Sequence, residues 1–111
     1  MGLSTHILDI AQGRPAIGVA IELAKLYRGD WQEVGSGITD IDGRCKTLLG
    51  GAELEEATYR LRFATAGYYE TQYLSGLYPF VDIVFSVAYP TQHYHIPLLL
   101  TANGYSTYRG S

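Results

Sequence analysis

The segment from Tyr59 to Phe63 constrains the fold of this chain most strongly, because its apolar and charged side chains alternate one by one. Tyr59, Leu61 and Phe63 alternate with Arg60 and Arg62. A period of two places the apolar side chains on one face of a strand and the guanidinium groups on the other. The segment is therefore predicted to be a strand with one buried face, in a sheet whose other face meets water.

Comparable short runs, rich in β-branched and aromatic residues, recur along the chain between clusters of Gly, Pro and Asp. Their spacing is typical of a sandwich of antiparallel strands. Further strands are predicted at Leu3 to Asp9, Gly18 to Tyr27, Trp31 to Ile38, Arg44 to Leu48, Val81 to Val87, Thr91 to Leu99 and Tyr105 to Arg109. The predicted fold class is all-β, a two-sheet antiparallel β-sandwich of eight strands.

The stretch from Ala64 to Tyr73 interrupts the alternation and predicts the one short helix, with Thr65 as its N-cap. Gln12 to Pro15 predicts a turn, because glycine allows a positive φ and proline fixes φ. No repeat or flexible linker is visible, and 111 residues suit one compact core. We therefore expect a single domain over residues 1–111.

Charge and cysteine content narrow the partners and the location of the chain. A formal charge of −3 at pH 7, with scattered basic residues, offers no electropositive surface to nucleic acid. No apolar run approaches the length that spans a bilayer, and the N-terminus lacks a secretory pattern. The one cysteine, Cys45, cannot form an internal disulfide, which suits a reducing compartment. These features predict a cytoplasmic protein without a nucleic-acid or membrane partner.

Histidine is the side chain that ordinarily titrates near neutral pH, so proton-transfer chemistry is sought around His6, His93 and His95. Alternation places His93 and His95 on one face of their strand, with Tyr94 and Ile96 on the other. Three interpretations stay open at this point. The imidazoles are solvated surface groups, they form a zinc site together with His6, or they belong to a metal-free site.

The C-terminal segment from Tyr105 to Ser111 combines hydroxyl groups, the guanidinium of Arg109 and the free carboxylate within seven residues. The last residues of a chain are usually poorly ordered and rarely form part of a site. A polar end that continues a strand is expected either to supply hydrogen-bonding groups to a pocket or to be a solvated tail.

Five segments carry a resemblance to a known family. They are Ser4 to Asp9 followed by Gly13 to Ala16, Asp42 to Cys45, Tyr59 to Phe63, His93 to Leu100 and Tyr105 to Ser111. In this order, over nearly the whole chain, the sequence resembles the 5-hydroxyisourate hydrolases, also called transthyretin-related proteins. The terminal Tyr-Arg-Gly-Ser distinguishes these hydrolases from transthyretin itself.

The resemblance implies a transthyretin-like (prealbumin) sandwich of two four-stranded sheets with one short helix. It also implies a homotetramer, a dimer of dimers, whose central channel holds two sites. The implied activity is hydrolysis of 5-hydroxyisourate to 2-oxo-4-hydroxy-4-carboxy-5-ureidoimidazoline in urate (purine) catabolism, without a metal or cofactor. The implied catalytic residues are His6, Arg44, His95 and Ser111, and His6, Arg44 and Tyr108 are implied to bind the substrate.

The chemistry of these residues suits that reaction. One imidazole, of His6 or His95, would act as general base on a water that attacks the C6 carbonyl. Arg44 would stabilise the developing negative charge, and the carboxylate of Ser111 would orient a histidine or the water. His93 is expected either to support the site by a hydrogen bond or to be simply exposed. The alternative function is a non-enzymatic, transthyretin-type protein that binds a small ligand, and a zinc hydrolase is a further rival.

Overall fold

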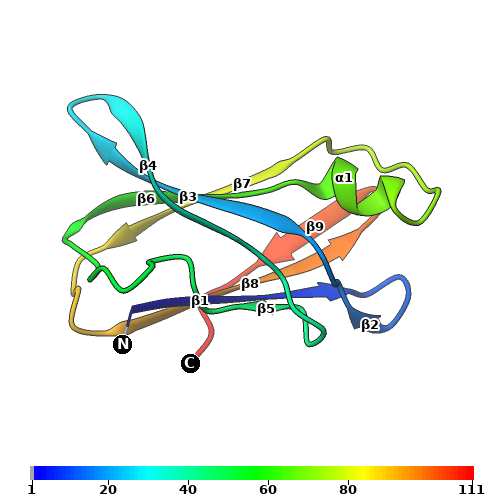
Figure 1. Ribbon diagram of the computed structural model, residues 1–111, viewed down its shortest axis with the longest axis horizontal. Helices are drawn as coiled ribbons and strands as arrows, with labels where there is room; N and C mark the ends of the chain where they lie inside the picture. Colours follow the sequence, from blue (N-terminus) through cyan, green and yellow to red (C-terminus); the bar gives the residue numbers. More distant parts are fainter. Residues whose placement is uncertain (1) are drawn as a thin grey trace.

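Two β-sheets lie face to face in the computed structural model of the chain, which describes residues 2–111 (Figure 1). The first sheet has the order β2-β1-β8-β9, and β5 pairs with β1 beside β2. Its strands are β1 (Gly2–Asp9), β2 (Arg14–Pro15), β5 (Arg44–Cys45), β8 (His93–Thr101) and β9 (Gly104–Thr107). The second sheet has the order β4-β3-β6-β7. Its strands are β3 (Ala20–Tyr27), β4 (Asp30–Ile38), β6 (Ala57–Phe63) and β7 (Val81–Val87).

Strand β6 confirms the alternation seen in the sequence. Leu61 and Phe63 are fully buried in the core between the sheets. On the opposite face, Arg62 donates two hydrogen bonds, of 2.7 and 2.8 Å, to the carboxylate of Asp82 on β7. The guanidinium of Arg60 stacks over the ring of Trp31. The solvent-exposed face of this sheet is therefore stabilised by an ion pair and a cation–π contact, and its other face by apolar packing.

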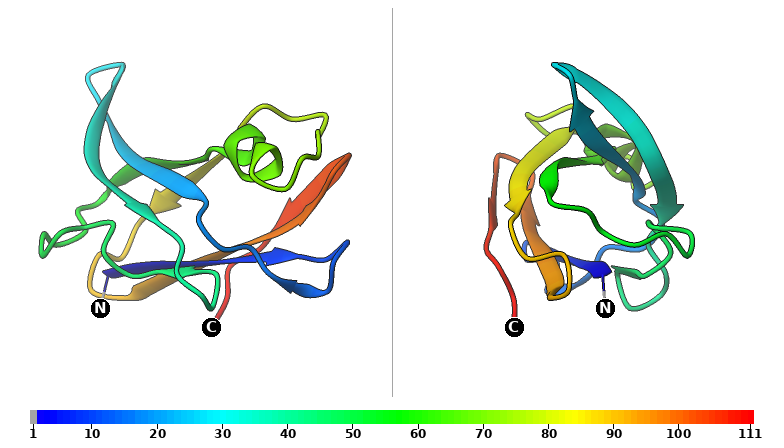
Figure 2. Two further views of the ribbon diagram at one scale, coloured as in Figure 1. Left: turned by 45° about the vertical axis from the view of Figure 1, so that its right-hand side comes forward. Right: turned by 90° about the vertical axis from the view of Figure 1, so that its left-hand side faces the viewer.

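All eight predicted strands are present, and the structure corrects three details of the sheets. Arg14–Pro15, predicted as part of a turn, forms the two-residue strand β2 against the end of β1, so the first sheet has five strands where the resemblance implied four. The pairing of β1 with β8 is parallel, not antiparallel. Parallel neighbours need a long crossover connection. Here the connection between β1 and β8 includes the four strands of the second sheet (Figure 2).

The third correction is that β5 ends at Cys45, three residues earlier than predicted. Leu48 is completely buried in the core. A Cβ added to Gly35 on β4 would lie 1.6 Å from the Leu48 carbonyl oxygen, so the two backbones touch there. The chain leaves the sheet after Cys45 because this segment closes the side of the sandwich against β4.

The helix α1 (Thr65–Glu70) is shorter than the predicted Ala64 to Tyr73. The prediction that Thr65 is the N-cap is wrong: Ala64 takes that position, and the Thr65 hydroxyl instead donates a 2.7 Å hydrogen bond to the Tyr78 carbonyl. Tyr73, with a φ of 58°, lies in the turn beyond the helix. Within residues 2–111, no helix has the length and apolarity needed to cross a membrane.

Candidate active site

The outer face of the first sheet carries the histidines. On β1, Leu3, Thr5 and Ile7 are buried between the sheets, and the residues that alternate with them point outward. On β8, Tyr94 and Ile96 are buried, whereas His93 is exposed and His95 is half-buried. The predicted alternation around the two histidines is therefore confirmed.

The parallel pairing of β1 with β8 places Ser4 opposite His95. The Ser4 hydroxyl lies 2.8 Å from Nδ1 of His95 and 2.8 Å from Nε2 of His93. Ser4 thus joins the two imidazoles on the outer face of the sheet. Sequence reasoning did not single it out, although its place two residues before His6 puts both side chains on one face of β1.

Arg44 reaches the same face from the other side of β1. In the antiparallel pairing of β1 with β5, His6 and Arg44 stand directly opposite each other. Side chains in such positions lie on one face with Cβ atoms about 5 Å apart. His6 therefore lies between the strand that carries Arg44 and the strand that carries His95.

The turn before Arg44 fixes this position. The Asp40 carboxylate accepts hydrogen bonds from the backbone N–H of Asp42 (2.9 Å) and of Arg44 (3.0 Å). These bonds, that of Arg44 first, lower the pKa of Asp40. Gly43 has a φ of +73°, and a Cβ at this residue would lie 2.5 Å from the carbonyl oxygen of Ile7. Only glycine fits here without strain, so the approach of β5 to β1 depends on it.

The electrostatics of this face act on His95. Partial burial lowers its pKa, and the charge of Arg44 and then the neighbouring His6 and His93 lower it further. A lowered pKa means that the imidazole is neutral at pH 7 and has a lone pair to offer. His95 therefore has the protonation state of a general base.

The end of the chain lies beside His95. The backbone N–H of Gly110 donates a 2.8 Å hydrogen bond to the His95 carbonyl and continues the register of β9 with β8. The same register sets Tyr108 opposite Pro97, on the face of the histidines, with 59% of Tyr108 exposed. Ser111 follows Gly110 and is exposed. The terminal segment is thus an ordered neighbour of the site.

Arg109 does not join this face. Its guanidinium lies 4.2 Å from the centroid of the Tyr94 ring. It also donates hydrogen bonds to the Gln92 side chain (3.1 Å) and to the His93 carbonyl (3.3 Å). Alternation along the terminal segment turns this guanidinium away from Tyr108, so within one chain it does not share the face of the histidines.

A sequence model of the HIUase/Transthyretin family matches residues 3–110. The chain belongs to this family. It is 40% identical over 111 residues to the 5-hydroxyisourate hydrolase of Mus musculus, covering 98% of this chain and 94% of that protein. It is 40% identical over 114 residues to the 5-hydroxyisourate hydrolase of Deinococcus radiodurans, covering 99% and 96%. The resemblance inferred from the five segments is confirmed.

Two solved structures of the family show why the backbone alone does not separate its activities. Sea bream transthyretin in complex with thyroxine has a TM-score of 0.92 and 28% identity, covering 99% of this chain and 95% of that chain. The Klebsiella pneumoniae 5-hydroxyisourate hydrolase has a TM-score of 0.87 and 33% identity, covering 100% of both chains. Function within this family must therefore be argued from side chains.

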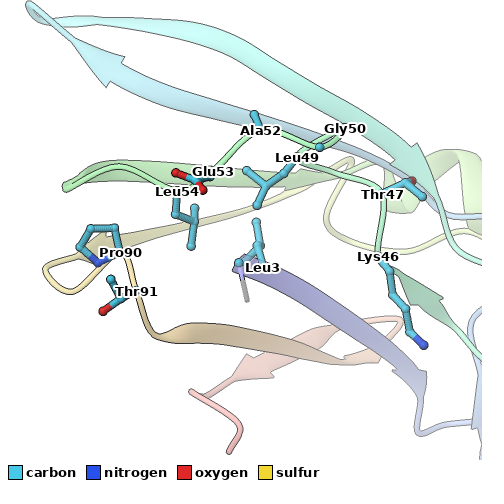
Figure 3. A pocket seen from close by; sticks show the side chains of 12 residues that line it. Leu3, Lys46, Thr47, Leu49, Gly50, Ala52, Glu53, Leu54, Pro90 and Thr91 are labelled. Carbon is cyan, nitrogen blue, oxygen red and sulfur yellow. The ribbon is translucent and has the colours of Figure 1, made fainter.

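The candidate site lies on an open sheet face, where His93 is exposed and His95 is half-buried. A hollow of about 760 Å³ lies elsewhere, where Leu3 at the start of β1 meets the loop from Lys46 to Leu54 (Figure 3). None of the predicted site residues lines it. Within residues 2–111, no group of three His, Cys, Asp or Glu side chains has the arrangement of a metal site.

Proposed function

We propose that this chain hydrolyses 5-hydroxyisourate to 2-oxo-4-hydroxy-4-carboxy-5-ureidoimidazoline, a step of urate (purine) catabolism, without a metal or cofactor. The observation that carries the proposal is the gathering of His6, Arg44 and His95 on one face of three neighbouring strands. The names of the Mus musculus and Deinococcus radiodurans relatives support it. Two imidazoles and a guanidinium suit a planar, polar ring rather than an apolar ligand.

In the proposed mechanism, His95 acts as the general base. Its lowered pKa keeps the imidazole neutral at pH 7, so Nε2 accepts a proton from water as the oxygen adds to C6. The guanidinium of Arg44 stabilises the negative charge on the carbonyl oxygen. The C6–N1 bond then breaks, and an imidazole, of His95 itself or of His6, returns a proton to N1. Tyr108 contacts the ring from the segment that follows β9.

Ser111 is proposed as the fourth member of the catalytic set. The pairing of Gly110 with His95 holds the chain end next to the imidazole. The hydroxyl or a carboxylate of Ser111 would orient the water or a histidine through a hydrogen bond. Ser111→Ala should therefore impair turnover more than folding.

The open face calls for a second protomer to enclose the substrate. We propose that residues 1–111 form a single domain and that four copies assemble as a dimer of dimers around a channel holding two sites. The edge strands β7 and β9 support this assembly, since Val84 on β7, Tyr105 on β9 and Tyr108 just beyond β9 are exposed. A cytoplasmic location agrees with the one unpaired cysteine, the buried Cys45.

The test is the decay of ultraviolet absorbance of freshly prepared 5-hydroxyisourate. We expect the wild-type chain to accelerate decay and His95→Ala to lower kcat about 100-fold or more. Gln32→Ala, on exposed β4 of the other sheet, should match the wild type. Decay that is equal with and without wild-type protein would refute the proposed function.

A ligand-binding role is the second candidate, favoured by the close backbone match to a transthyretin that was solved with thyroxine. The outer face of this chain offers charged and polar groups, which suit an aromatic hormone poorly. We expect titration calorimetry with thyroxine to show no binding at micromolar concentration. Binding together with absent hydrolysis would favour the carrier role instead.

A further inference from the structure

The hydroxyl of Ser4 bridges His93 and His95 with two contacts of 2.8 Å, and the proposed mechanism uses neither Ser4 nor His93. We propose that Ser4 and His93 are positioning residues that select the tautomer of His95: neutral His93 accepts the Ser4 proton and thereby leaves Nε2 of His95 free to act as a base. This inference rests on the proposed function for its catalytic meaning.

The argument starts from the single proton of a serine hydroxyl. Ser4 can donate to only one of the two ring nitrogens that it contacts, and it must accept from the other. If Ser4 donates to His93, then Nδ1 of His95 carries a proton and donates to Ser4. Neutral His95 then has its lone pair on Nε2, where it can remove a proton from water. If Ser4 donates to His95, Nε2 carries the proton and His95 is no base.

Protonation of the two histidines has opposite effects on this chain of hydrogen bonds. When His95 gains a proton at Nε2, both bonds are kept, because Nδ1 already donates to Ser4. When His93 is protonated, its Nε2 can only donate. The Ser4 hydroxyl must then turn toward His95 and impose the inactive tautomer. Neutral His93 therefore supports the base, and protonated His93 suppresses it.

Several charged groups surround this chain of hydrogen bonds. Arg44 on β5 and His6 on β1 act electrostatically on His95. From the segment beyond β9, Arg109 donates to the His93 carbonyl, and Ser111 follows the Gly110 that pairs with His95. A test of the proposal must therefore change the hydroxyl or the His93 ring while keeping all four of these groups.

Four variants of the full-length protein separate the hydrogen-bonding role from a structural one. Ser4→Ala removes the bridge, and Ser4→Thr keeps a hydroxyl. His93→Phe removes the acceptor, whereas the amide oxygen of His93→Gln can accept from Ser4 but does not titrate. We expect Ser4→Ala and His93→Phe each to lower kcat about tenfold with little change in KM. Ser4→Thr and His93→Gln should stay within about threefold of the wild type.

Two further readouts respond to the tautomer itself. The acid limb of the kcat/KM profile should be shallower in His93→Gln than in the wild type, because one of the two imidazoles whose protonation stops the base is gone. Ring ¹⁵N shifts of His95 above its titration should show Nδ1–H in the wild type and a shift toward Nε2–H in Ser4→Ala. The double variant Ser4→Ala/His93→Phe should be no slower than either single variant.

The inference is overturned if Ser4→Ala leaves the ¹⁵N shifts of His95 unchanged, or if His93→Gln keeps the wild-type acid limb. Failure of the proposed function gives a different result. A wild-type chain that does not hydrolyse 5-hydroxyisourate would refute the catalytic step. The ¹⁵N shifts would still decide whether Ser4 and His93 set the tautomer.

Discussion

Gly110 and the imidazole of His95 touch so closely that no side chain fits between them: a Cβ at Gly110 would lie 2.4 Å from Cδ2 of the ring. The backbone at Gly110 therefore limits the positions that the His95 ring can take. Gly110→Ala should displace the ring and lower kcat about tenfold or more, since misplacement of about 1 Å costs up to about 100-fold. Steady-state kinetics measure this, with Gly104→Ala as the control because its nearest contact would be an ordinary 3.5 Å. Equal rates in both variants would show that the contact is not needed.

A second prediction concerns Gly43, which allows β5 to approach β1 and so places Arg44 opposite His6. In Gly43→Ala the alanine would have a positive φ and its Cβ would clash with the Ile7 carbonyl. In Gly29→Ala the alanine would also have a positive φ, of +83°, but its Cβ would have open space around it. Backbone strain costs about 1–3 kcal/mol in either variant. Chemical denaturation should therefore show a larger loss of unfolding free energy for Gly43→Ala, and only this variant should lose activity. A smaller loss than in Gly29→Ala would contradict the clash.

The buried carboxylate of Asp9 gives a third prediction, on stability. The Tyr68 hydroxyl donates to it at 2.6 Å, and burial raises the pKa of Tyr68 to about 12. Tyr68→Phe should cost about 1–3 kcal/mol of unfolding free energy, because the carboxylate loses a buried donor. The Tyr69 hydroxyl, also buried, has no hydrogen-bond partner within residues 2–111. Tyr69→Phe should therefore be neutral or stabilising when the free energies of unfolding of both variants are measured by chemical denaturation.

A fourth prediction concerns pH. The pKa of His95 is lowered by burial and by the charge of Arg44. The imidazole is therefore neutral above that lowered pKa, and the part of the acid limb that belongs to His95 should lie below the ordinary histidine value of about 6.5. In Arg44→Gln the titration of His95, followed by NMR, should move upward because one cation is gone. An unchanged or lower midpoint would argue against the coupling of the two residues.

Much of this architecture could be predicted from local patterns. Alternation was enough to place Leu61 inward and Arg62 outward, and to put His93 and His95 on one face. The N-cap at Thr65 failed because the hydroxyl found a partner outside the helix, the Tyr78 carbonyl. Such a partner depends on tertiary packing, which no local pattern reveals.

The site itself was predictable only in part, for the same reason. The resemblance named His6, Arg44, His95, Tyr108 and Ser111, and the structure brings His6, Arg44 and His95 together on one face. The link through Ser4 depends on the parallel register of β1 with β8. That register joins strands at opposite ends of the sequence, so no hairpin or turn signal encodes it. The catalytic and substrate-binding roles of all five residues stay predictions.

The parallel pairing of Ser4 with His95 has a consequence for folding. The two residues are 91 positions apart in the sequence. Contacts of such high sequence separation form slowly, because the entropic cost of closing the intervening loop must be offset first. The bridge between Ser4 and the two imidazoles is therefore expected to form late in refolding, after the hairpin of β3 and β4 in the second sheet.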